Sequence, residues 1–111
     1  MVEEDKDEAF KWFKEAADLG HEDGCHAVAL YYMEQKRYKR AKLYFEEAAR
    51  QGHPLALFNL AEMYFNGLGM PAPSRAKAIE LFKMGHRDSH LPSKRRLLDL
   101  GVDPDEPPKP R

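Results

Sequence analysis

The chain of 111 residues suits one small domain, and its 42% apolar and 33% charged residues are typical of a folded protein with a well-solvated surface. Its net charge of −1 provides no overall field that would draw it to nucleic acid or to a membrane. The one cysteine, Cys25, excludes a disulfide within the chain, and no apolar stretch is long enough to span a bilayer. The acidic start lacks the apolar core of a signal peptide, so we expect a cytoplasmic location.

A helix-forming segment, which we call B, occurs three times along the chain. Residues 8–21 and 40–53 share an alanine, a phenylalanine, an Ala-Ala pair and a Gly-His pair at a constant offset of 32 residues. A third copy follows after a further 37 residues, and in it Gly85 and His86 replace the Ala-Ala pair while Ser89 replaces the glycine. The apolar residues recur with the spacing of one face of an α-helix, so each copy is predicted to be helical.

A second type of segment, which we call A, follows each B segment. Residues 24–32 align with residues 56–64, and a third copy at 90–100 keeps two leucines at the matching places. The order B-A-B-A-B-A predicts an all-α fold, a short right-handed α-solenoid of antiparallel helix pairs, over residues 1–100. Residues 101–111 are proline-rich and predict a flexible C-terminal tail. The expected helices cover residues 4–19, 23–35, 37–51, 54–66, 74–87 and 92–100.

The middle A segment and the loop after it carry the most specific motif. Ala56, Leu60 and Tyr64 are followed by Gly67-Leu68-Gly69 and, after a short loop, by Lys77-Ala78. This pattern resembles the Sel-one-like repeat (SLR) family, a relative of the tetratricopeptide repeats (TPR), over roughly residues 7–100. The resemblance implies an adaptor or scaffold that binds other proteins and is not an enzyme. The preceding unit departs from the pattern, because it lacks the Gly-x-Gly loop.

The A segments are expected to line the concave side of the solenoid. There the positions outside the core combine aromatic, thioether, amide and charged groups, a mixture that suits an extended or helical segment of another protein. The predicted partner-binding residues are Leu30, Tyr31, Glu34, Asn59, Glu62, Met63, Asn66 and Arg96.

The histidines suggest an alternative function. His86 and His90 are four residues apart on a helix, a spacing that could hold a metal ion in a hydrolase. However, His21, His53 and His90 recur at one repeat position, which favours a structural role, and the spacing shows no third or fourth ligand. We therefore predict no metal site and no cofactor.

The two ends of the chain suggest self-association as a second alternative. Residues 1–23 contain nine acidic and three basic side chains, whereas residues 75–96 contain seven basic and two acidic ones. The first B segment has no A segment before it, so we expect Trp12 and Phe13 to be incompletely covered. The basic run at residues 94–96 lacks the interleaved aromatic residues that stack on bases, so an acidic protein segment is expected there and nucleic acid is not.

Overall fold

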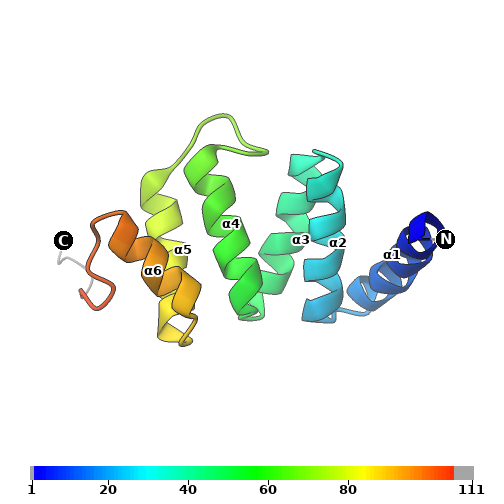
Figure 1. Ribbon diagram of the computed structural model, residues 1–111, viewed down its shortest axis with the longest axis horizontal. Helices are drawn as coiled ribbons and strands as arrows, with labels where there is room; N and C mark the ends of the chain where they lie inside the picture. Colours follow the sequence, from blue (N-terminus) through cyan, green and yellow to red (C-terminus); the bar gives the residue numbers. More distant parts are fainter. Residues whose placement is uncertain (1, 107–111) are drawn as a thin grey trace.

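The computed structural model describes the backbone of residues 2–106 and the side chains of residues 7–106. Within this part of the chain all regular structure is helical, in agreement with the predicted all-α solenoid (Figure 1). Each helix begins and ends within two residues of its expected position. The helices are α1 (Val2–Asp18), α2 (Glu22–Glu34), α3 (Tyr38–Arg50), α4 (Pro54–Asn66), α5 (Arg75–Arg87) and α6 (Leu91–Asp99).

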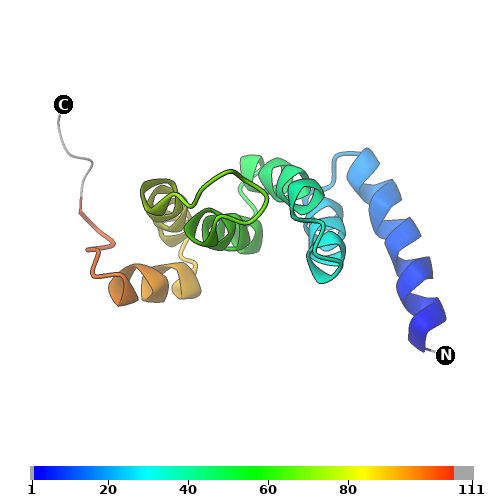
Figure 2. The same cartoon turned by 90° about the horizontal axis from the view of Figure 1, so that it is seen from above.

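The helices form two layers along an elongated body of 51 × 27 × 26 Å. Each helix packs against the next one in the chain. The A helices α2, α4 and α6 lie on one side, and the B helices α3 and α5 lie on the other (Figure 2). α1, also a B helix, closes one end of the row and projects towards the side that the A helices line. This side is the concave one, as the repeat pattern predicts.

The turns from a B helix to an A helix repeat one backbone geometry. Gly20 and Gly52 take left-handed conformations with φ of 86° and 85°, and Ser89 takes the equivalent place with φ of 64°. The histidine that follows each of them is the N-cap of the next helix. At α4 the ring Nδ1 of His53 accepts a hydrogen bond from the backbone N–H of Ala56 over 3.2 Å. The side chain of His53 therefore has a structural role at this joint, whereas the side chains of His21 and His90 do not cap their helices in this way.

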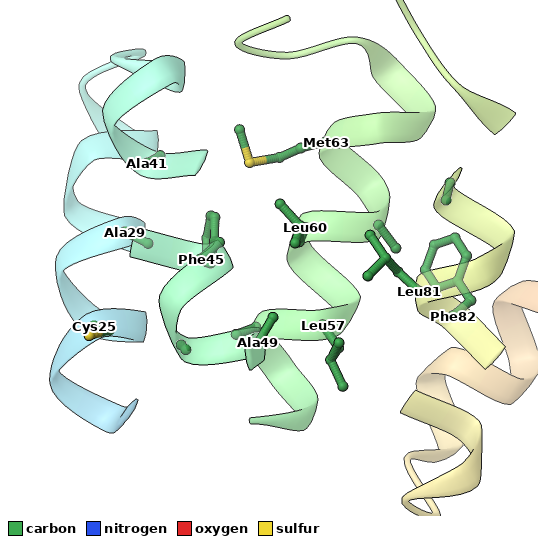
Figure 3. Close-up of a cluster of buried hydrophobic side chains, with 14 of the residues drawn as sticks. Cys25, Ala29, Ala41, Phe45, Ala49, Leu57, Leu60, Met63, Leu81 and Phe82 are labelled. Carbon is green, nitrogen blue, oxygen red and sulfur yellow. The ribbon is translucent and has the colours of Figure 1, made fainter. Parts of the chain in front are cut away.

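The core runs along the middle of the row and is built mainly from aromatic and aliphatic side chains. Leu60 and Met63 point from α4 towards α3, while Leu81 and Phe82 of α5 lie on the opposite side of α4 (Figure 3). Phe45 and Phe82, at the same repeat position, are fully buried. α4 is thus covered on two sides and forms the centre of the solenoid.

The first part of the expected tail is folded against the helices. Gly101, with φ of 75°, ends α6 and reverses the chain, so that the N–H of Val102 donates to the carbonyl of Leu97 over 2.9 Å. The Val102 side chain packs against the core, and Oδ1 of Asp105 lies 2.9 Å from Nε2 of His86 on α5. Residues 101–106 therefore follow the end of the solenoid, whereas residues 107–111 lie outside the described part of the chain.

Candidate functional site: the concave side and its groove

Two polar pairs connect the A helices across the concave side. Nδ2 of Asn59 on α4 donates to Nε2 of His26 on α2 over 3.1 Å. Nε of Arg96 on α6 donates to Oε1 of Glu62 on α4 over 3.0 Å, and both of these side chains are half-buried. A charged hydrogen bond that is partly shielded from water holds its geometry better than an exposed pair. The two pairs therefore tie α2 to α4 and α4 to α6.

A groove of about 480 Å³ lies between α4 and α6 and shares Arg96 with the second pair. The Arg96 guanidinium lies 4.8 Å from the centre of the Phe65 ring, and this cation–π contact fixes it together with Glu62. Leu91 is largely exposed at the mouth of the groove, and Arg95 is exposed beside it. The groove thus offers an apolar wall next to two guanidinium groups. Its lining consists of Phe58, Leu91, Pro92, Arg95, Arg96 and Asp99.

The predicted partner-binding residues fall into three groups in the structure. Leu30, Glu34 and Asn66 are exposed. Asn59, Glu62 and Arg96 are half-buried and form the pairs that join the A helices, and Tyr31 is half-buried with its ring stacked 4.0 Å from that of Phe10 on α1. Arg96 alone among the eight lines the groove.

The prediction for Met63 was wrong. Its side chain is 1% exposed and points from α4 towards α3, where it fills space in the core (Figure 3). Met63 occupies the same repeat position as the half-buried Tyr31. A flexible thioether can fold into a gap that a rigid phenol ring cannot enter. Met63 therefore presents no surface to a partner.

Most of the groove lining was missed from the sequence. Phe58 and Arg95 occupy the repeat position of His26. Phe58 packs edge-on against Phe82, with ring centres 5.5 Å apart. An aromatic residue within a helix is normally interpreted from sequence as part of the core, so its place in the groove was not predicted. One feature of the sequence could have indicated the groove. The last A segment begins, directly after a turn, with apolar and basic residues at positions 91–96.

His86 and His90, the residues of the alternative enzyme hypothesis, have separate partners. Nε2 of His86 contacts Asp105, and Nδ1 of His90 lies 2.8 Å from Oγ of Ser93, within the same helix start. Burial lowers the pKa of His90. Among the described residues no group of three or more His, Cys, Asp and Glu side chains could hold a metal ion.

The helices alternate between two layers, and the turn from a B helix to an A helix recurs after 32 and then 37 residues. This arrangement defines a helical repeat protein of the solenoid class. The chain belongs to the Sel1 repeat family, whose model matches residues 1–21, 23–53 and 54–85. This confirms the resemblance drawn from the motif around Gly67 and Gly69. Members of this family generally mediate protein–protein interactions and are typically scaffolds without enzymatic activity.

A solved structure supports the same assignment. The crystal structure of a Sel1 repeat protein from Oxalobacter formigenes is 26% identical in sequence, covers 90% of this chain and superimposes with a TM-score of 0.75. This chain spans 44% of the length of that protein. Within the described residues no helix is both long and apolar enough to cross a membrane.

Proposed function

We propose that this protein is an adaptor or scaffold that binds an extended or helical segment of a partner protein on its concave side, with the groove between α4 and α6 as the main contact. The observation that carries the proposal is the groove itself, in which the exposed Leu91 lies next to the guanidinium groups of Arg95 and Arg96. Leucine side chains take up apolar groups, and guanidinium groups pair with carboxylates in a fixed geometry.

The chemistry of the lining favours one kind of ligand segment. Arg96 is held in place by Glu62 and Phe65, so its side chain loses little conformational entropy when it binds a carboxylate. Asp99 at the edge of the groove repels a second acidic group, which limits the length of an acidic run that fits. The expected ligand segment has one apolar side chain next to one acidic residue. Leu30 and Asn66, exposed on α2 and α4, extend the contact along the concave side.

A peptide-display selection against the 111-residue chain tests this function. Selected sequences are expected to combine an apolar and an acidic residue, and their affinity is expected to fall at least about tenfold in the variant Leu91→Ser with Arg95→Ser. Both side chains are exposed, so the variant should fold normally. The matched control is Leu43→Ser, because Leu43 is an exposed leucine on α3, a helix of the other layer.

The outcome is decided by comparing the two variants at low protein concentration. The proposal holds if the control binds like the unmodified protein while the groove variant does not. Selected peptides that bind the groove variant as tightly as the control would show that the partner segment lies elsewhere.

A further inference from the structure

An acidic stretch of chain that follows α6 lies against α5. It leaves the end of α6 and runs towards the layer of the B helices (Figure 2). Its start is fixed, because Nη2 of Arg75 donates to the carbonyl of Leu100 over 2.8 Å and the Val102 side chain packs against the core. Residues 103–106, which we call the strap, continue from this anchored start. The acidic side chains of the strap are Asp103, Asp105 and Glu106.

Within the described part of the chain, one side-chain hydrogen bond attaches the strap to α5. Oδ1 of Asp105 lies 2.9 Å from Nε2 of His86, and this hydrogen bond lowers the pKa of the Asp105 carboxyl. The backbone N–H groups of Asp105 and Glu106 both donate to Asp103, within the strap itself. The Asp105 side chain is 78% exposed. A segment held by a single exposed pair opens at a low cost in free energy, so the side of α5 beneath the strap is accessible to another chain.

The strap leaves positive charge on this side of α5 unused. Lys83 and Arg87, one helical turn apart, line a cavity of about 810 Å³ between α5 and the strap, together with His86. Among the described residues, neither Lys83 nor Arg87 has a carboxylate partner. Lys94 on α6 also lies close enough to lower the pKa of Asp105. We call the following four side chains the basic site: Lys83, His86, Arg87 and Lys94.

The rest of the cavity lining is apolar or already paired. Glu80 lies in the lining, but its carboxylate is 3.8 Å from Nζ of Lys77 and is partly neutralised by it. The half-buried Ile79 forms an apolar part of the α5 side, and Pro104 lines the cavity from the side of the strap. The cavity thus combines a small apolar surface with an excess of positive charge.

We propose that the basic site binds an acidic segment of a partner protein, and that the strap occupies this site until such a segment displaces it. The strap itself shows the chemistry that fits, because Pro104 is followed by Asp105 and Glu106. A partner segment with an apolar residue and a longer acidic run can also pair with Lys83 and Arg87. It therefore gains charge-assisted hydrogen bonds that the strap does not make.

This binding surface goes beyond the proposed function of the groove. None of the four side chains of the basic site lines the groove between α4 and α6. The proposal rests on contacts within residues 75–106 and does not depend on what precedes or follows them.

Fluorescence anisotropy with the 111-residue chain tests the proposal. The probe is a short labelled peptide in which a proline is followed by a run of aspartate and glutamate residues. A peptide with lysine in place of each acidic residue is the control. The acidic peptide is expected to bind at least about tenfold more tightly than the control, and its affinity should fall as the salt concentration rises.

Two results of this assay would overturn the proposal. The first is equal affinity, or no affinity, for the acidic and the basic peptide. The second is tighter binding of a single-stranded oligonucleotide than of the acidic peptide, which would assign the basic site to nucleic acid.

Removal of the unused charges locates the peptide. Lys83→Ser with Arg87→Ser should weaken binding of the acidic peptide about tenfold, since two charge-assisted pairs are lost. Lys11→Ser with Lys39→Ser is the control, because it removes the same charge from exposed positions of α1 and α3. The control should change the affinity less than about twofold. Equal weakening in both variants would show that net charge, and not the basic site, holds the peptide.

The groove variant separates this proposal from the proposed function. Leu91→Ser with Arg95→Ser should bind the acidic peptide within about twofold of the unmodified chain, although it loses the peptides selected for the groove. The variant Lys83→Ser with Arg87→Ser should show the opposite behaviour. Loss of the acidic peptide in the groove variant alone would place it in the groove and overturn this inference, while the proposed function would stand.

The strap gives a readout that gains affinity and so does not depend on a damaged site. Asp105→Ala with Glu106→Ala should strengthen binding of the acidic peptide about twofold to fivefold, because the strap then occupies the basic site less of the time. Glu8→Ala with Glu15→Ala is the control for net charge, since both side chains are exposed on α1. Unchanged or weaker binding in the strap variant, or an equal gain in the control, would contradict displacement of the strap.

Discussion

Gly85 on α5 and Ser93 on α6 approach so closely that a Cβ atom on Gly85 would lie 2.5 Å from Oγ of Ser93. The joint between α1 and α2 has the reverse arrangement, since a Cβ atom on Gly24 would lie 2.7 Å from that of Ala16. These are equivalent repeat positions. Each of these joints therefore has one glycine, on one helix or the other, and the close approach of the helices depends on it.

Gly85→Ala is expected to lower the free energy of unfolding by about 1–3 kcal/mol, because the added methyl group collides with Ser93 in a filled site. The double variant Gly85→Ala with Ser93→Gly copies the α1–α2 joint and should recover a good part of the loss. Urea unfolding of both variants measures this. Equal loss in the single and double variants would show that the collision is not the cause.

Ser89→Gly is expected to stabilise the protein by up to about 1 kcal/mol, since Ser89 has a left-handed backbone with φ of 64° that glycine adopts without strain. The same hydrogen bonds close this turn and the one at Gly52, so the substitution should not disturb them. Thermal unfolding should show a rise of a few degrees, about 4–8 °C at most. A lower melting temperature would indicate that the serine hydroxyl has a stabilising role.

Phe45→Ala should destabilise the protein by about 3–5 kcal/mol, because Phe45 is fully buried and its removal leaves a cavity. Phe13→Ala is the matched control at the equivalent position of α1, where the ring is half exposed, and should cost less than about 1 kcal/mol in dilute solution. Chemical denaturation of the two variants compares them directly. Similar losses would mean that α1 is packed more tightly than its exposure indicates.

His26 should make the protein less stable in mild acid. Burial and the adjacent His53 lower the pKa of His26 below its ordinary value of 6.5, although Asp23 opposes the shift. The unfolded chain therefore binds a proton near pH 6.5 that the folded chain binds only at lower pH, so stability is full above about pH 6.5 and falls as the pH decreases towards the folded value. His90, whose pKa burial also lowers, acts in the same direction.

The variant His26→Phe tests the assignment, because Phe58 already occupies the equivalent position in the next A helix. Its free energy of unfolding should vary less between about pH 7.5 and pH 5 than that of the unmodified protein. The substitution also removes the hydrogen bond to Asn59, so the free energy of unfolding should be lower by a similar amount at every pH. This uniform loss is separate from the change of the free energy with pH. An unchanged slope would assign the acid sensitivity to other groups.

Cys25 should resist thiol reagents in the folded protein. The side chain is 1% exposed and burial raises its pKa, so little reactive thiolate is available at neutral pH. The reaction rate with a chromogenic disulfide should increase at least about a hundredfold when urea unfolds the chain. Rapid labelling without denaturant would mean that the α1–α2 joint opens readily, and hydrogen exchange at α1 would then be fast as well.

The repeat in the sequence determined the fold class and the order of the six helices. Periodic apolar residues define which face of each helix is buried, and Gly20, Gly52 and Pro54 define where helices end and begin, since these are local properties of the backbone. The same local logic predicted that Trp12 and Phe13 are incompletely covered, because no A segment comes before the first B segment in this sequence, and both side chains are exposed.

The tertiary structure decided what the exposed and polar residues do. Asn59, Glu62 and Arg96 lie 33 and 34 residues from their bonded partners along the chain, and no local pattern reveals which polar groups meet across neighbouring helices. Met63 and Tyr31 share a repeat position, yet one is in the core and the other is half-buried, because the volume left by neighbouring side chains differs between the repeats. Gly85 replaces the alanine of the other B helices at a point where Ser93 lies directly opposite, and the repeat pattern alone does not show this contact. Periodicity thus determines which side of a helix faces the core, whereas the fit between particular side chains depends on how the helices are placed in three dimensions.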